Sequence, residues 1–140
     1  MPSSPAYDVY VSHAWKFGEL YDRLNDLLHE SPDFHYTNHS TVQDKPSANA
    51  NTDAGELAII AAIEAKLAAS KGMIILSGMY VANNYWMKKE LDLAIKHKKP
   101  IIGIIPWGQG RIPVDVQKNA IEMVGWSGPS ITEAIRRHFV

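Results

Sequence analysis

The chain has 140 residues, of which 46% are apolar and 21% charged, and its formal net charge is −1. Its length is typical of one domain, and its composition is that of a globular protein. It has no cysteine, which excludes disulfides, thiolate zinc sites and a cysteine nucleophile. The balanced charge argues against binding to nucleic acid or to an anionic membrane surface. No apolar run approaches the roughly 20 residues that span a bilayer, and the N-terminus does not resemble a signal peptide. We therefore expect a single cytoplasmic domain over residues 1–140.

Hydrophobic patterning predicts strands that alternate with helices along the chain. In chain order we expect a strand at 7–11, a helix at 17–28, a strand at 34–36, a helix at 53–69, a strand at 73–76, a helix at 85–98, strands at 101–105 and 123–126, and a terminal helix. The runs at 73–76 and 101–105 are wholly apolar, as in strands covered on both faces. The polar stretch 39–53 predicts a long and mobile loop.

Capping residues mark the starts of three predicted helices. Asp53, with Glu56 three residues later, resembles a capping box. Asn84 is a good N-cap for the helix at 85–98. Ser130 with Glu133 predicts a second capping box at the start of the terminal helix.

Five strands separated by helices predict a three-layer α/β domain of flavodoxin-like architecture. We expect a five-stranded parallel sheet in the order 2-1-3-4-5, with the ligand crevice beyond the carboxyl ends of strands 1 and 3. That geometry brings Ser12, His13 and Ser77 to one rim, together with the segment that leads into Asn84.

Several familiar ligand sites do not fit this pattern. The residues after strand 1, 12–16, contain no glycine for a flavin phosphate, and strand 3 ends in Ser77-Gly78 rather than in the aspartate of a response receiver. Neither of the glycine-rich phosphate-binding motifs is present. The six histidines are scattered, so we expect no metal site.

The segment at 77–95 carries the most specific pattern. Trp86 and Glu90 are four residues apart and therefore share one helix face. An apolar stripe expected to be buried lies beside them and consists of Leu91, Ala94 and Ile95. Glu90 is then either a solvated side chain paired with Lys88 or Lys89, or a carboxylate that is partly buried or at the rim of a cleft.

The motifs of this segment resemble those of TIR domains. Ser12-His13 ends the first strand, and residues 77–94 read Ser-x-x-Tyr-x-x-x-x-Tyr-Trp-x-x-x-Glu-Leu-x-x-Ala. Ile-Ile-Gly-Ile follows at 101–104. Together they are most similar to the bacterial TIR-like family that includes the Thoeris antiviral-defence proteins.

This resemblance implies cleavage of the nicotinamide–ribose bond of NAD, with Glu90 in the catalytic position and NAD as substrate, without a further cofactor. One carboxylate suffices because nicotinamide leaves as a neutral molecule and needs no general acid. Further substrate contacts are expected from Ser12, His13, Trp15, Ser77, Tyr80, Asn84 and Trp86.

The resemblance also implies a linear, cyclic or conjugated ADP-ribose product, assembly into a homo-oligomer on activation, and an effector protein that senses the product. Two alternatives stay open. One is a non-catalytic TIR-like interaction module, and the other is a nucleoside-transferring glycosidase of similar fold, which also uses a glutamate.

Overall fold

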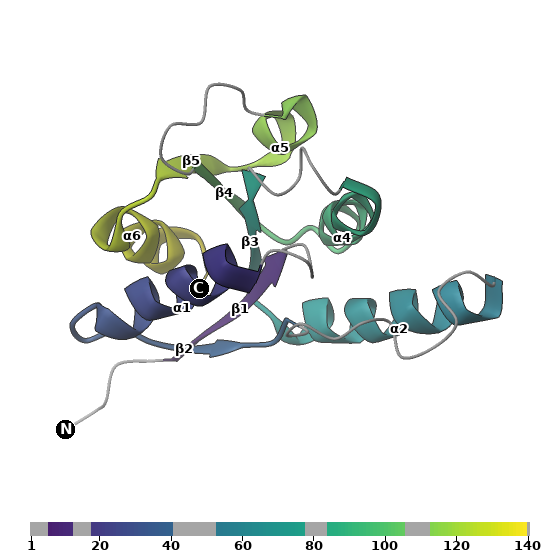
Figure 1. Cartoon of the computed structure of the whole chain (residues 1–140), viewed down its shortest axis with the longest axis horizontal. Coiled ribbons are helices and arrows are strands. Elements are labelled where there is room, and N and C mark those ends of the chain that lie inside the picture. Colours follow the sequence, from purple (N-terminus) through teal and green to yellow (C-terminus); the bar gives the residue numbers. More distant parts are fainter. Residues whose placement is uncertain (1–5, 13–17, 41–52, 78–83, 106–112, 140) are drawn as a thin grey trace.

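A computed structural model describes residues 6–12, 18–40, 53–77, 84–105 and 113–139, with the backbone alone at 18–21, 53, 54, 56 and 84–86. Strands and helices alternate along the chain (Figure 1). In order they are β1 (Ala6–Ser12), α1 (Gly18–Glu30), β2 (His35–Asn38), α2 (Asp53–Ala69), β3 (Gly72–Leu76), α4 (Asn84–Lys96), β4 (Ile101–Ile105), α5 (Val114–Asn119), β5 (Glu122–Gly125) and α6 (Gly128–His138).

The sheet has five parallel strands in the order β2-β1-β3-β4-β5, as the sequence predicts. Helices α1 and α6 pack together on one side of the sheet, and α2 packs against α4 on the other (Figure 1). The result is the predicted three-layer, flavodoxin-like arrangement. It places the carboxyl ends of all five strands at one edge of the sheet.

Strands β1, β3 and β4 occupy the centre of the sheet and are buried, which confirms the prediction from their apolar runs. Tyr10, Ile75 and Ile102 each have at most 1% of their surface exposed. Continuous apolar runs suit strands that are covered by helices on both faces. The core of the domain therefore surrounds the strands whose carboxyl ends border the predicted crevice.

Helix α4 begins at Asn84, one residue before the predicted start at Tyr85, and ends at Lys96 rather than at Lys98. Lys98 has a φ of 56°, and the Lys99 N–H donates to the Ala94 carbonyl oxygen, as in a left-handed helix cap. Ile95 was expected in the buried stripe but is 42% exposed, whereas Leu91 and Ala94 are fully buried.

The C-terminal third differs from expectation at two points. Ser127, not Ser130, caps α6, because the Ser127 hydroxyl accepts from the Ser130 N–H and Pro129 lies in the first turn. Helix α5 was not predicted, since it has six residues and buries only Val116. Most of the loop expected at 39–53 lies outside the described residues.

Gly72, the first residue of β3, offers a test of the core packing. A Cβ atom there would lie 2.3 Å from the Cε1 atom of Phe139, whose ring is buried. We expect Gly72→Ala to lower the free energy of unfolding by about 1–3 kcal/mol, as other overpacked core substitutions do. Urea unfolding of the two proteins measures this difference.

Gly125→Ala in β5 is the matched control, because a Cβ there meets nothing within 4 Å. It should leave the midpoint unchanged or slightly raised. Equal destabilisation by both substitutions would contradict the packing of Phe139 on β3.

Candidate functional site

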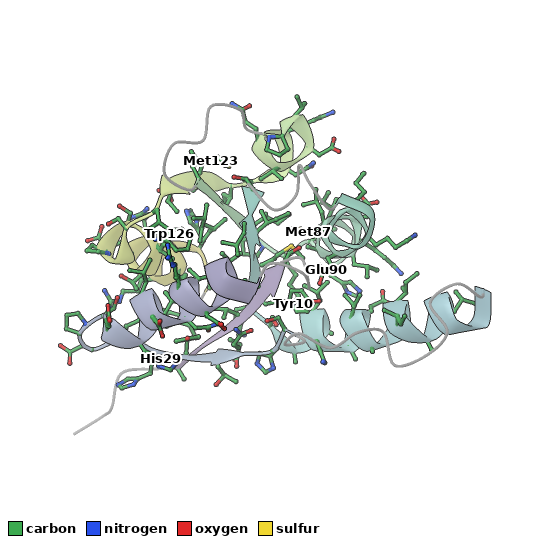
Figure 2. The ribbon with its side chains drawn as sticks, in the orientation of Figure 1. Tyr10, His29, Met87, Glu90, Met123 and Trp126 are labelled. Carbon is green, nitrogen blue, oxygen red and sulfur yellow. The ribbon has the colours of Figure 1, made fainter. Side chains whose placement is uncertain are left out.

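The candidate site forms where α4 crosses the carboxyl end of β1. Side chains alternate between the faces of a strand, so Tyr10 and Ser12 lie on the same face of β1. Helix α4 packs against β1 and presents Glu90 to that face. Figure 2 shows Tyr10 and Glu90 together between the two elements, with Met87 nearby on α4.

The two hydroxyls hold the two oxygens of the Glu90 carboxylate separately. The Ser12 hydroxyl donates to Glu90 Oε1 over 2.8 Å, and the Tyr10 hydroxyl donates to Glu90 Oε2. All three residues are buried, and Glu90 retains 8% of its surface exposed. Ser12 thus contacts the Glu90 carboxylate directly.

Burial sets the electrostatic state of this carboxylate. Desolvation raises the pKa of Glu90 to about 7, and the hydrogen bonds from Tyr10 and Ser12 lower the pKa without cancelling that effect. Lys88 forms an ion pair with Asp92, with 2.9 Å between Nζ and Oδ1. The interpretation of Glu90 as a solvated side chain is therefore wrong.

Such a carboxylate has two chemical uses. A group whose pKa lies near neutrality can accept or donate a proton at the pH of the cell. In its ionised form it places a negative charge in surroundings of low dielectric constant, where it stabilises a nearby positive centre more strongly than in water.

Ser77 is buried directly after β3, but its hydroxyl does not contact Glu90. It donates to the carbonyl oxygen of Ile104 over 2.7 Å and so ties the end of β3 to β4. The pairing of Ser12 with Ile75 puts Ser77 at the same edge of the sheet as Ser12. Ser12 and Ser77 are therefore neighbours in the fold, as expected, with hydroxyls directed to different partners.

Five further residues expected near the substrate are only partly described or lie outside the description. Asn84 and Trp86 belong to the first turn of α4, where the structure describes the backbone alone. His13, Trp15 and Tyr80 lie outside the described residues. Their expected contacts with substrate stay predictions.

Tyr10 is the site residue that the sequence did not single out. It lies in an apolar strand and was counted only as part of the predicted core. Two signals pointed to it: Tyr10 shares a face with Ser12, and a buried tyrosine hydroxyl usually needs a hydrogen-bond partner.

The residues that the structure describes contain no group of three histidine, aspartate or glutamate side chains arranged to hold a metal ion. None of the helices within them is long and apolar enough to cross a membrane.

The sequence was compared with families and with curated proteins. The family model described as "Thoeris protein ThsB, TIR-like domain" matches residues 10–111. This span is well over half of the chain and includes the whole of α4 and all three members of the Tyr10–Ser12–Glu90 cluster. No curated protein matches the chain significantly.

The raised pKa of Glu90 predicts a pH-dependent stability. The folded protein holds this proton more tightly than the unfolded chain, so Glu90 contributes stability that is present below its ordinary pKa of 4.5 and is lost as the pH rises toward 7. Glu90→Gln removes that loss. We expect the free energy of unfolding of the variant, relative to that of the wild type, to increase by on the order of 3 kcal/mol from pH 4 to pH 8, measured by urea unfolding.

Glu64→Gln is the control, because Glu64 is exposed to solvent and bonded to Lys96 and His97, which lower its pKa. Glu64 contributes stability that is present above pH 4.5 and is lost as the pH falls through the lowered pKa, which is the opposite pH dependence. A difference between wild type and Glu90→Gln that stays constant across this pH range would disprove the burial of an ionisable carboxyl here.

Proposed function

This chain belongs to the family of Thoeris ThsB TIR-like domains, and we propose that it cleaves the nicotinamide–ribose bond of NAD as part of an antiphage defence response. The observation that carries the proposal is the Glu90 carboxylate, buried at the carboxyl end of β1 and held by two hydroxyls. The proposal assigns Glu90 the catalytic role that the family motif implies.

The position of Glu90 in the fold supports this assignment. In open parallel sheets, ligands bind beyond the carboxyl ends of the strands where the strand order reverses direction. Here that point lies between β1 and β3. Glu90 contacts Ser12, the last residue of β1, and so lies at the inner end of that binding region.

The chemistry requires one carboxylate. As the bond between ribose C1′ and the pyridinium nitrogen breaks, its electron pair passes to the ring and nicotinamide leaves uncharged. Positive charge develops at C1′, where ionised Glu90 stabilises it. Water then adds to C1′ and releases a proton, which yields ADP-ribose; attack by the adenine of the same molecule or by another nucleophile yields a cyclic or conjugated product.

The other predicted residues complete the proposed site. We assign the substrate contacts to Ser12, His13, Trp15, Ser77, Tyr80, Asn84 and Trp86. The N-terminal turn of α4, which begins at Asn84, has backbone N–H groups suited to the pyrophosphate. We further propose that the protein assembles into a homo-oligomer on activation and that an effector protein senses the product.

Glu90→Gln tests the catalytic role. The amide keeps the size of the side chain but removes its charge, so we expect NAD consumption to fall by about 10²–10³-fold, as for other preorganised charge stabilisers. The measurement is NAD turnover under conditions in which the wild type is active, together with the thermal midpoint of each protein. Glu64→Gln, the same change at an exposed site on α2, should leave turnover unaltered.

Three outcomes would refute the proposal in different ways. Unchanged turnover in Glu90→Gln removes its catalytic role, and lost turnover with a collapsed thermal midpoint makes Glu90 structural. Release of free base from deoxynucleosides without NAD cleavage identifies a nucleoside-transferring glycosidase instead. Mass spectrometry of nucleotides from phage-challenged cells that express the protein identifies the product.

A further inference from the structure

We infer that Tyr10 and Ser12 are positioning residues for Glu90: their hydroxyls fix the orientation of the carboxylate and favour its ionised form. The inference goes beyond the proposed function, because it gives β1 a part in the chemistry. Its consequence for turnover rests on that function, whereas its consequence for the ionisation of Glu90 does not.

The geometry of the hydrogen bonds supports the positioning role. One donor on each oxygen prevents the carboxylate from rotating about its last bond, which a single donor would permit. Both donors come from the same strand, two residues apart. That strand is held by its neighbours on both sides, since Tyr10 pairs with Met73 of β3 and Val9 pairs with Asn38 of β2.

The surroundings explain why the hydroxyls matter for charge. Met87 and Leu91, on the same helix as Glu90, are buried, so the carboxylate has little contact with water. Hydrogen bonds donated to a carboxylate favour its charged form. Burial raises the pKa of Glu90, and the hydrogen bonds from Tyr10 and then Ser12 are what oppose that rise.

None of the ion pairs described on the neighbouring elements includes Glu90. β3, which pairs with β1, has no titratable side chain. On β1, Asp8 pairs with His39, and on α4, Lys88 pairs with Asp92. On α2, Glu64 pairs with Lys96 and His97. Within the part of the chain that the structure describes, desolvation and the hydroxyls of Tyr10 and Ser12 account for the shift in the pKa of Glu90.

The arrangement also leaves Glu90 able to act on a substrate. A carboxylate oxygen has two lone pairs, and each oxygen of Glu90 receives one hydrogen bond from these hydroxyls. Among the described residues, no further hydrogen bond to these oxygens is made, which leaves one lone pair on each for a ribose hydroxyl. The two hydroxyls orient the carboxylate and use one lone pair on each of its oxygens.

The test compares Tyr10→Phe and Ser12→Ala with the wild type by two measurements. The first is the titration of the Glu90 carboxyl carbon by NMR, with Glu90→Gln to assign the signal. A hydrogen bond to a charged group contributes roughly 1.5–3 kcal/mol, so we expect each variant to raise the titration midpoint by about one to two pH units. The larger rise is expected for Tyr10→Phe, because its hydrogen bond has the greater effect on the pKa of Glu90.

The second measurement is the pH profile of kcat/KM for NAD. The acidic limb of the profile should shift to higher pH by the same number of pH units as the NMR midpoint. At a pH above the shifted limb, a loss of about tenfold in kcat should remain, because the carboxylate is no longer held in one orientation. Ser12→Thr keeps a hydroxyl and should restore both the midpoint and the rate.

Tyr36→Phe is the matched control. It removes the hydroxyl of a partly buried tyrosine, which donates to the Asn25 side chain far from Glu90 along the chain, and should change neither measurement. If Tyr10→Phe does not fold, Ser12→Ala carries the same test at the other oxygen.

The outcomes separate this inference from the proposed function. Unchanged NMR midpoints in both variants overturn the inference whether or not NAD is cleaved. A turnover that increases in Tyr10→Phe also overturns it, because the hydroxyl would then restrain the carboxylate rather than prepare it. If Glu90→Gln loses turnover while the acidic limb stays in place in both β1 variants, the proposed function stands and the inference fails.

Discussion

The structure depends on a buried carboxylate, Glu90, which forms no ion pair with any of the described lysine, arginine or histidine side chains. Glu90 lies on the buried face of α4, against β1, and its charged form is disfavoured there by desolvation. Two hydroxyls offset part of that cost and leave the pKa near neutrality. An ion pair with lysine or arginine would have stabilised the charge further, but it would also have neutralised the field that a positive centre needs.

The strand order and the helix packing together place Glu90 against β1. Parallel pairing brings the ends of β1 and β3 together, and the strand order puts both at the centre, where helices cover each face. The packing of α4 on β1 then brings Glu90 onto the face that carries Tyr10 and Ser12. At the same edge, the hydroxyl of Ser77 donates to the Ile104 carbonyl oxygen and so links the end of β3 to β4.

The sequence was sufficient to predict the fold because its signals are local. Apolar runs of four or five residues marked the central strands, and helical periodicity between them led to the strand order. The signals failed where local patterns compete: Ser130 and Ser127 both fit a helix cap, and a proline in the first turn fixed the choice at Ser127. Helix α5 is too short to show a period.

The site was predictable in part. The spacing of Trp86 and Glu90, together with the family motif, identified the carboxylate, whereas its hydroxyl partners come from 78 and 80 residues earlier in the chain. A contact of that range depends on how two elements pack, which hydrophobic patterning does not specify. Tyr10 therefore looked like an ordinary core residue until the helix and the strand were seen together.

This separation along the chain has a consequence for folding. β1 precedes nearly everything that covers it, and its pairing with β3 closes a loop of some sixty residues, from Val9 to Gly72. Such long-range pairing forms late, because the entropy of loop closure must be overcome before the contacts stabilise the fold. As long as α4 is not docked on β1, Glu90 lies in water with an ordinary acidity, so the raised pKa belongs only to molecules in which this packing is complete.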